Sequence, residues 1–198
     1  DFEFIGRQGM LDEVLWDKQT GWPYFKNGTP SLADDVPFKN SIQKIDSLFT
    51  DDFSTDKNLA FWEWDINYEK PLIEISNGEM YVTPVRSGIS FLGLRPKTGD
   101  YDLSSEIFPT TKPGGIGIYS NDQNLLALTV NQTELVLLQM KKNKREILAR
   151  EQINLKGNVY LKFEAVNGRY FQFFWSENGE EWIQVKVGEE YQVDGTFI

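Results

Sequence analysis

Residues 159–185, VYLKFEAVNGRYFQFFWSENGEEWIQV, are the stretch that most restricts how this chain folds. Two runs of alternating apolar and polar residues are separated by Asn167-Gly168, a dipeptide that accepts the positive φ required at both central positions of a type I′ turn. A period of two is typical of a strand with one buried face. The stretch therefore predicts an antiparallel β-hairpin followed by a further short strand.

A two-residue turn also predicts the register of this hairpin, with Phe163 opposite Gln172 and Leu161 opposite Phe174. One face then carries Val159, Leu161, Phe163, Ala165, Tyr170 and Phe174. The other face carries Tyr160, Phe171, Phe173 and Trp175 beside Lys162 and Glu164. The first face packs in a core. The second either packs against more protein or meets a ligand, so Phe171, Phe173 and Trp175 are candidate ligand-binding residues.

Short apolar runs separated by turn signals continue through the chain from residue 49 onward. Asn77-Gly78 predicts another hairpin, and residues 59–64 alternate in a way that places Trp62 and Trp64 on one face of a strand. Further strands are expected at residues 91–94, 104–108, 116–119, 125–130, 134–140 and 146–153. Aromatic residues favour pleated strands and make up 14% of the chain. The sequence therefore predicts an all-β antiparallel sandwich.

Charge and composition restrict the classes of function. The formal net charge of −10 argues against binding nucleic acid, whose phosphates need a basic groove, and against anionic membrane surfaces. The chain contains neither His nor Cys, which excludes a Ser-His-Asp triad, a thiolate nucleophile and a zinc–thiolate site. An acidic surface rich in aromatic residues suits a protein that meets neutral ligands.

Several residues are candidates for a site, each with a structural alternative. The ring of Trp62 either stacks on a sugar or packs in the core. Asp51 and Asp52 either help to hold a structural Ca²⁺, an ion that prefers oxygen ligands, or form a turn at the entry of a strand. Acidic pairs such as Glu180-Glu181 could be the two catalytic carboxylates of a glycosidase, but they are more typical of a solvated turn. No other cofactor is expected.

The chain divides by pattern into three parts. Residues 1–31 carry Trp, Phe and Leu side chains that so short a segment cannot bury by itself, so we expect it to pack on another domain. Residues 32–48 are weakly patterned and are expected to form a linker, and residues 49–198 form the sandwich. We expect the chain to be part of a longer protein, with the last strands of the sandwich lying beyond Ile198.

Two groups of motifs resemble family 43 glycoside hydrolases, the β-xylosidase/α-arabinofuranosidase group. The segment Gly6-Arg7-Gln8-Gly9-Met10-Leu11-Asp12, with Trp16-Asp17 and Gly21-Trp22-Pro23, resembles the end of their five-bladed β-propeller. Asp52-Phe53-Ser54, Leu59, Trp62-Glu63-Trp64 and Gly78 resemble the start of the concanavalin A-like sandwich behind that propeller, and Ser176, Gly179, Trp182 and Gly195-Thr196-Phe197 resemble its later strands.

This resemblance implies a concanavalin A-like (jelly-roll) sandwich preceded by the tail of a catalytic propeller. The family's catalytic carboxylates lie upstream of residue 1, so the resemblance implies no catalytic residue here and no activity of the chain alone. Arg7 matches the family Arg that lines a sugar subsite. The implied role is to cap the active-site cleft and stabilise the parent enzyme, with the chain's own propeller and a neutral carbohydrate as partners.

Two alternatives from other classes remain. An autonomous carbohydrate-binding module predicts an exposed aromatic platform. A purely structural sandwich predicts that Phe171, Phe173 and Trp175 are buried against the opposite sheet.

Overall fold

The computed structural model describes residues 14–25, 48–85, 88–155 and 157–198. The described residues fall into two compact units, divided between Asp52 and Phe53. Arg7 lies outside the described residues, and so does the predicted linker apart from Leu48.

The first unit contains a small antiparallel hairpin, in which β1 (Val14–Trp16) pairs with β2 (Pro23–Phe25). Asp17 closes its turn, because a single carboxylate oxygen accepts hydrogen bonds from the backbone N–H groups of Gln19 (2.9 Å) and Thr20 (2.7 Å). These bonds favour the ionised form and hold the pKa of Asp17 below its ordinary value.

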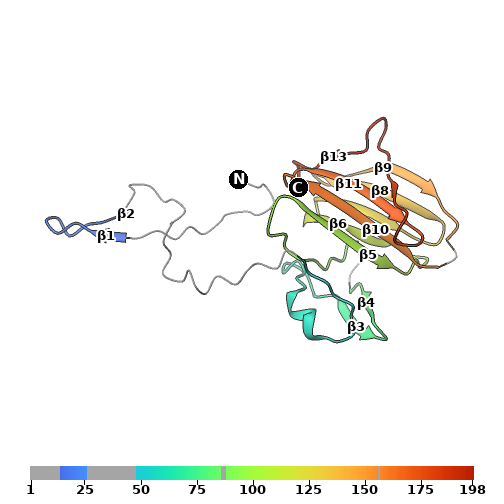
Figure 1. The fold of residues 1–198 in the computed structure, drawn as a ribbon, viewed down its shortest axis with the longest axis horizontal. Coiled ribbons are helices and arrows are strands. Elements are labelled where there is room, and N and C mark those ends of the chain that lie inside the picture. The colour runs from blue at the N-terminus through green and yellow to red at the C-terminus, as the bar shows by residue number, and fades with distance from the viewer. Residues whose placement is uncertain (1–13, 26–47, 86–87, 156) are drawn as a thin grey trace. The chain divides into compact units, whose positions relative to one another are not determined.

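The second unit is a sandwich of two antiparallel sheets, drawn as two layers of arrows in Figure 1. One sheet has the order β12-β11-β10-β5, with β13 also paired to β11; we call it the β10–β11 sheet. Its strands are β5 (Tyr101–Ile107), β10 (Val159–Val166), β11 (Tyr170–Ser176), β12 (Ile183–Gln184) and β13 (Val193–Asp194). The other, the β7–β8 sheet, has the order β6-β7-β8-β9. Its strands are β6 (Gly114–Asn121), β7 (Asn124–Val130), β8 (Glu134–Lys141) and β9 (Lys144–Gln152).

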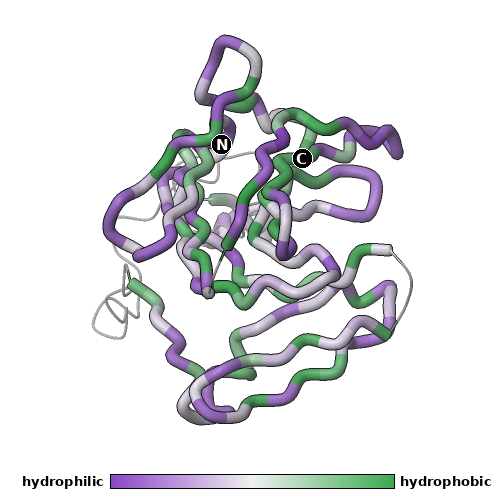
Figure 2. Tube along the Cα trace, turned by 90° about the vertical axis from the view of Figure 1, so that its right-hand side faces the viewer, coloured by the Kyte–Doolittle hydropathy of each residue, from purple (hydrophilic) through white to green (hydrophobic). Residues whose placement is uncertain are grey.

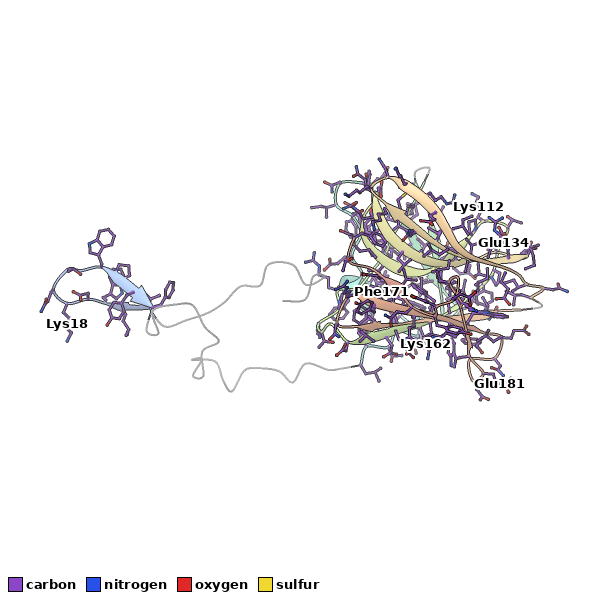
Figure 3. All side chains as sticks on the ribbon, turned by 90° about the horizontal axis from the view of Figure 1, so that it is seen from above. Lys18, Lys112, Glu134, Lys162, Phe171 and Glu181 are labelled. Atoms are coloured by element: carbon purple, nitrogen blue, oxygen red, sulfur yellow. The ribbon has the colours of Figure 1, made fainter. Side chains whose placement is uncertain are left out.

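The hydrophobic core lies between these two sheets, and the all-β prediction is confirmed. Buried residues of both sheets form this core. Hydrophobic (green) and hydrophilic (purple) residues alternate along several of the strands in Figure 2, as expected for strands with one buried face. The fully buried large side chains include Leu126, Leu128, Leu135, Leu137, Leu161, Phe171 and Phe173. Figure 3 labels Phe171 between the two layers. No helix within the described ranges is long and apolar enough to cross a membrane.

The predicted register of the β10–β11 hairpin was wrong by one residue. Phe163 lies opposite Phe173 and Leu161 opposite Trp175, because three residues, not two, connect the strands. A slip of one residue moves every side chain of a strand to the other face of the sheet. Phe171, Phe173 and Trp175 therefore share the inner face with Val159, Leu161, Phe163 and Ala165, whereas Tyr170 and Phe174 lie on the outer face.

The extra residue in this loop is explained by bonds to neighbouring loops. Asn167 and Gly168 do adopt positive φ (55° and 61°), as the sequence predicted. Their N–H groups, however, donate to the Asp100 carboxylate (2.7 Å) and the Gly99 carbonyl (2.6 Å). The Arg169 carbonyl accepts from Gly195 (2.7 Å), so tertiary contacts, which the hairpin sequence does not contain, keep Arg169 out of the ladder.

Residues 53–95 add smaller elements to the sandwich unit. β3 (Leu72–Ser76) and β4 (Glu79–Thr83) form the hairpin predicted around Asn77-Gly78, with both turn residues at positive φ. The strand predicted at residues 59–64 was wrong. The 3₁₀ helix η2 (Lys57–Phe61) occupies its first half, and Glu63 bridges Gly93. Local bonds such as Trp62 N–H to the Leu59 carbonyl (3.2 Å) replace the ladder there.

Candidate functional site

A hollow of about 530 Å³ opens on the sandwich unit, at the end of the β7–β8 sheet where β6 turns into β7 and β8 into β9. We call it the polar groove. It is lined by Asp65, Asn67, Tyr68, Asn121, Asp122, Gln123 and Asn143. Its volume falls within the range of small-ligand pockets, roughly 300–1,000 Å³. These residues come from three segments that are distant in sequence.

The first wall of the polar groove is the loop at residues 65–68. The Asp65 carboxylate accepts hydrogen bonds from the backbone N–H of Asn67 (3.0 Å) and from its side-chain amide (2.8 Å). The Asp65 carbonyl accepts from the Tyr68 N–H (3.0 Å). An Asp that binds the backbone two residues ahead forms an Asx-turn, which fixes the loop without a strand partner.

The second wall is made by two neighbouring hairpin turns. In the β6–β7 turn, the side-chain oxygen of Asn121 accepts from the Gln123 N–H (2.9 Å) and from the Asn124 amide (3.2 Å). The β8–β9 turn places Lys142 and Asn143 at positive φ (49° and 66°). Hydrogen bonds from Lys142 N–H to Asn124 (3.1 Å) and from Asn143 N–H to the Gln123 carbonyl (3.2 Å) hold the two turns together.

Tyr119 joins the two walls. Its hydroxyl lies 2.8 Å from Asp65 Oδ2 and 2.6 Å from Asp122 Oδ1, and its ring stacks on Phe91 with 4.5 Å between centroids. Burial and the two carboxylates raise the pKa of Tyr119 far above its ordinary value. The Asn67 N–H and, next, the Tyr119 hydroxyl lower the pKa of Asp65. The groove is therefore lined by ionised carboxylate at neutral pH.

The polar groove offers a mixed set of hydrogen-bonding groups. Two carboxylates line it, and Lys and Arg are absent from its lining. The side-chain amides of Gln123 and Asn143 are exposed and take part in none of the hydrogen bonds found among the described residues. The Tyr68 side chain is 38% exposed. This lining disfavours anions and favours a ligand that both donates and accepts hydrogen bonds.

The aromatic residues predicted to bind a ligand lie elsewhere. Phe171, Phe173 and Trp175 are 0%, 1% and 6% exposed and belong to the core. Stacking on a sugar needs an exposed ring face, so the structure corrects their placement on an open face. It confirms what the purely structural alternative predicted for these three side chains. The Trp175 Nε1–H is buried without a hydrogen-bond partner.

The outer face of the β10–β11 sheet carries Lys162, whose ammonium lies 4.5 Å from the Phe174 ring centroid and 4.9 Å from that of Trp182. Glu164 pairs with the same ammonium at 2.8 Å. Figure 3 labels Lys162 on the side of this sheet away from Phe171. Lys162, Glu164, Phe174 and Trp182 therefore form a packed charged–aromatic cluster on this face.

Trp62, Asp51 and Asp52 do not line the polar groove. Trp62 is half-buried, with its ring centroid 6.1 Å from that of Phe53, and its ligand role stays a prediction. Asp51 and Asp52 precede the sandwich unit, and their Ca²⁺ role also stays a prediction. Within the described residues, His, Cys, Asp and Glu form no group of three or more able to hold a metal ion.

The residues of the polar groove were not predicted as a site. The sequence predicts no more than turns at Asn121-Asp122-Gln123-Asn124 and Lys141–Lys144, and a loop at residues 65–71. Their meeting depends on the pairing of β6, β7, β8 and β9 and on the Tyr119 bridge across 54 positions of sequence. The sequence signal for this site is the frequency of Asn and Asp in these turns. Asn and Asp are equally frequent in turns that bind nothing, so the signal does not predict a site.

Comparison with known proteins places the fold. Residues 102–198 match the family model described as "Beta xylosidase C-terminal Concanavalin A-like domain". A xylan beta-1,4-xylosidase structure from Bacillus halodurans matches with a TM-score of 0.71 and 20% identity, over 94% of this chain and 39% of that one. The GH43 protein BlXynB from Bacillus licheniformis matches with a TM-score of 0.67 and 18% identity, over 94% and 38%.

A third structure, the Bacteroides ovatus xyloglucan PUL GH43B, has a TM-score of 0.59 and 16% identity, over 93% of this chain and 38% of that one. The present chain thus spans less than two fifths of the length of these three proteins. The sequence matches none of the curated proteins with which it was compared.

Proposed function

We propose, from the match of residues 102–198 to the family model of beta xylosidase C-terminal concanavalin A-like domains, that this chain is the non-catalytic accessory part of a glycoside hydrolase. The proposed parent enzyme acts on xylan- or arabinan-type oligosaccharides. The observation that carries the proposal is the match of residues 102–198 to that family model. The structures of a xylan beta-1,4-xylosidase and of the GH43 protein BlXynB, each of which matches 94% of the chain, support it.

The proposed partner is a catalytic β-propeller that precedes the sandwich in the same protein. The β1–β2 hairpin supports it, because Trp16 and Trp22 are 66% and 75% exposed and Tyr24 is 49% exposed. Large apolar side chains gathered on one short element are typical of surfaces that another protein covers. We propose that the propeller covers this hairpin.

The finer part of the proposal is that the sandwich closes one side of the propeller's active-site cleft. Tyr191 is the residue that we choose to test this contact, because it is an aromatic side chain, 49% exposed, in the loop between β12 and β13. An aromatic ring that borders a sugar subsite contributes apolar contact area and a hydroxyl for hydrogen bonding.

The test uses the chain with its propeller, each produced separately from the same gene, and aryl β-xylosides and aryl α-arabinofuranosides as substrates. We expect no hydrolysis by the chain alone. We expect the propeller to gain activity or thermal stability when the chain is added, and Tyr191→Ala to reduce the gain in activity. Hydrolysis by the chain alone, or a propeller indifferent to it, contradicts the proposal.

A second candidate function is that of a carbohydrate-binding module that acts independently of the propeller. The observation that favours it is the polar groove, since its free amides, carboxylates and partly exposed Tyr68 suit a polyhydroxy ligand.

A further inference from the structure

We propose that the polar groove is a subsite for a neutral oligosaccharide, separate from any catalytic cleft. The proposal rests on the proposed function for the choice of saccharide, of the xylan or arabinan type. The geometry of the groove carries it, because seven polar or aromatic residues from three segments meet around a space of about 530 Å³.

The charges of the lining narrow the class of ligand. Asp65 and Asp122 are the charged residues of the groove, and both are acidic. Three lysines flank Asn143 at the tip of the β8–β9 hairpin, but they do not line the groove. A phosphate or carboxylate ligand would face two carboxylates without an opposing cation in the lining, so an anion is disfavoured.

The hydrogen-bonding groups match the hydroxyls of a sugar. Each hydroxyl both donates and accepts, so it needs an acceptor and a donor within reach. Asp65 and Asp122 supply acceptors, whereas the side-chain amides of Gln123 and Asn143 supply donors that no described protein group uses. The exposed part of Tyr68 supplies a ring for the apolar face of a sugar.

The walls of the groove are fixed before a ligand arrives. The Asx-turn at Asp65 and Asn67, the side-chain bonds of Asn121 and the link between Asn143 and Gln123 all hold loop backbone in place. Fixed walls reduce the entropy cost of binding, which matters for a polar ligand whose hydrogen bonds only replace those to water.

A divalent cation is the rival occupant of the polar groove. A Ca²⁺ site takes six to eight oxygen ligands and usually several carboxylates. The groove offers two carboxylates, and the described residues contain no group of three acidic or other metal-binding side chains placed to hold a metal. The neutral saccharide is therefore the occupant that the lining favours.

The experiment is a calorimetric titration of the whole chain with xylotetraose and, separately, with α-1,5-linked arabinotetraose and with Ca²⁺. The test variant is Gln123→Ala with Asn143→Gly, since glycine keeps the positive φ of 66° at residue 143 while it removes the amide. The control is Gln132→Ala, which removes an exposed amide from the turn between β7 and β8, outside the groove lining. Unfolding curves of all three proteins establish that each is folded.

We expect at least one tetrasaccharide to bind, the test variant to bind at least tenfold more weakly, and the control to bind as the unmodified chain does. Equal binding by the test variant overturns the proposal, since the sugar then sits elsewhere. Absence of binding at millimolar sugar, or binding of Ca²⁺ in the groove without sugar, also overturns it. Association with the propeller is measured in a separate experiment. Failure of this proposal can therefore be distinguished from failure of the proposed function.

Discussion

A single ion pair, Arg169–Asp194, closes the loop that sets the register of the central hairpin. The guanidinium Nη2 lies 2.9 Å from Asp194 Oδ2, and Asp194 Oδ1 accepts the backbone N–H of Thr196, also at 2.9 Å. Both bonds favour the ionised form, first the one from Arg169, so the pKa of Asp194 lies well below its ordinary value of 3.8. About half of each side chain is exposed, so solvent screens the pair.

Asp194→Asn should lower the free energy of unfolding by about 0.5 kcal/mol at pH 7, the size typical of exposed pairs. A carboxylate whose pKa is lower in the folded state stabilises the fold above its unfolded pKa. This contribution is lost as pH falls from about 4 towards the folded value. Urea unfolding at pH 7, 4 and 3 measures the difference between the two proteins, which should narrow with acid.

Glu189→Gln is the matched control for Asp194→Asn. It breaks the Lys186–Glu189 pair, whose Glu side chain is 96% exposed, and should change the free energy of unfolding by less. If the difference in unfolding free energy between the unmodified chain and Asp194→Asn stays constant across the three pH values, the pH-dependent stability does not come from this carboxylate.

The Tyr119 hydroxyl gives a second prediction at this scale. Tyr119→Phe removes the proton donor between Asp65 and Asp122, so we expect a loss of about 1 kcal/mol of stability. The pKa of Asp65 should rise, because the ionised carboxylate loses a donor. Carboxyl NMR titration measures the pKa, and chemical denaturation measures the stability. Tyr81→Phe, at a tyrosine that is 50% exposed, is the control and should leave Asp65 unchanged.

At the scale of elements, turn chemistry predicted well wherever a hairpin depends only on its own residues. Asn77-Gly78 closes a two-residue turn between Ser76 and Glu79, as its sequence indicates. Asn167-Gly168 has the same residues at similar φ, but bonds to Gly99 and Asp100 add Arg169 to the loop. The sequence of the hairpin does not contain those contacts. Which face of β11 is buried could therefore not be predicted from the hairpin alone.

The register itself predicts a contrast between two adjacent phenylalanines. Phe173 is 1% exposed in the core, whereas Phe174 lies half-buried on the outer face beneath Lys162. Phe173→Ala should cost about 3–5 kcal/mol of unfolding free energy, because it removes a buried ring and leaves a cavity. Phe174→Ala should cost about 1 kcal/mol, since it mainly removes a cation–π contact and part-exposed area. Urea denaturation followed by circular dichroism compares the two, and the register predicted from a two-residue turn requires the reverse order.

At the scale of the whole molecule, the all-β sandwich could be predicted because strand alternation and turn spacing recur along the chain. The polar groove could not, because Asp65, Asp122 and Asn143 meet only once β6 to β9 are paired in the observed order. Residues 59–64 show the opposite failure, in which alternation was present but a 3₁₀ helix formed at Lys57–Phe61. A short alternating run predicts a strand only if another strand is available to pair with its whole length.

The exposed aromatic residues of the β1–β2 hairpin give the last prediction, which rests on the proposed propeller partner. Trp22 is 75% exposed, and a tryptophan buried by a partner is the residue type that most often dominates an interface. Trp22→Ala should therefore weaken binding of the separately produced propeller at least tenfold, or about 1.4 kcal/mol. It should change the unfolding of the sandwich by less than about 0.5 kcal/mol, as is usual for an exposed position.

Lys18→Ala is the control for this experiment, because Lys18 lies in the turn of the same hairpin, as Figure 3 labels it, and contributes no aromatic surface. Binding to immobilised propeller, measured by surface plasmon resonance, should separate the two variants. Equal affinities for Trp22→Ala and Lys18→Ala would mean that the aromatic side chain of residue 22 is not covered by the propeller. The hairpin's exposed apolar surface would then need a different partner, because a monomeric protein rarely leaves such a cluster open to water.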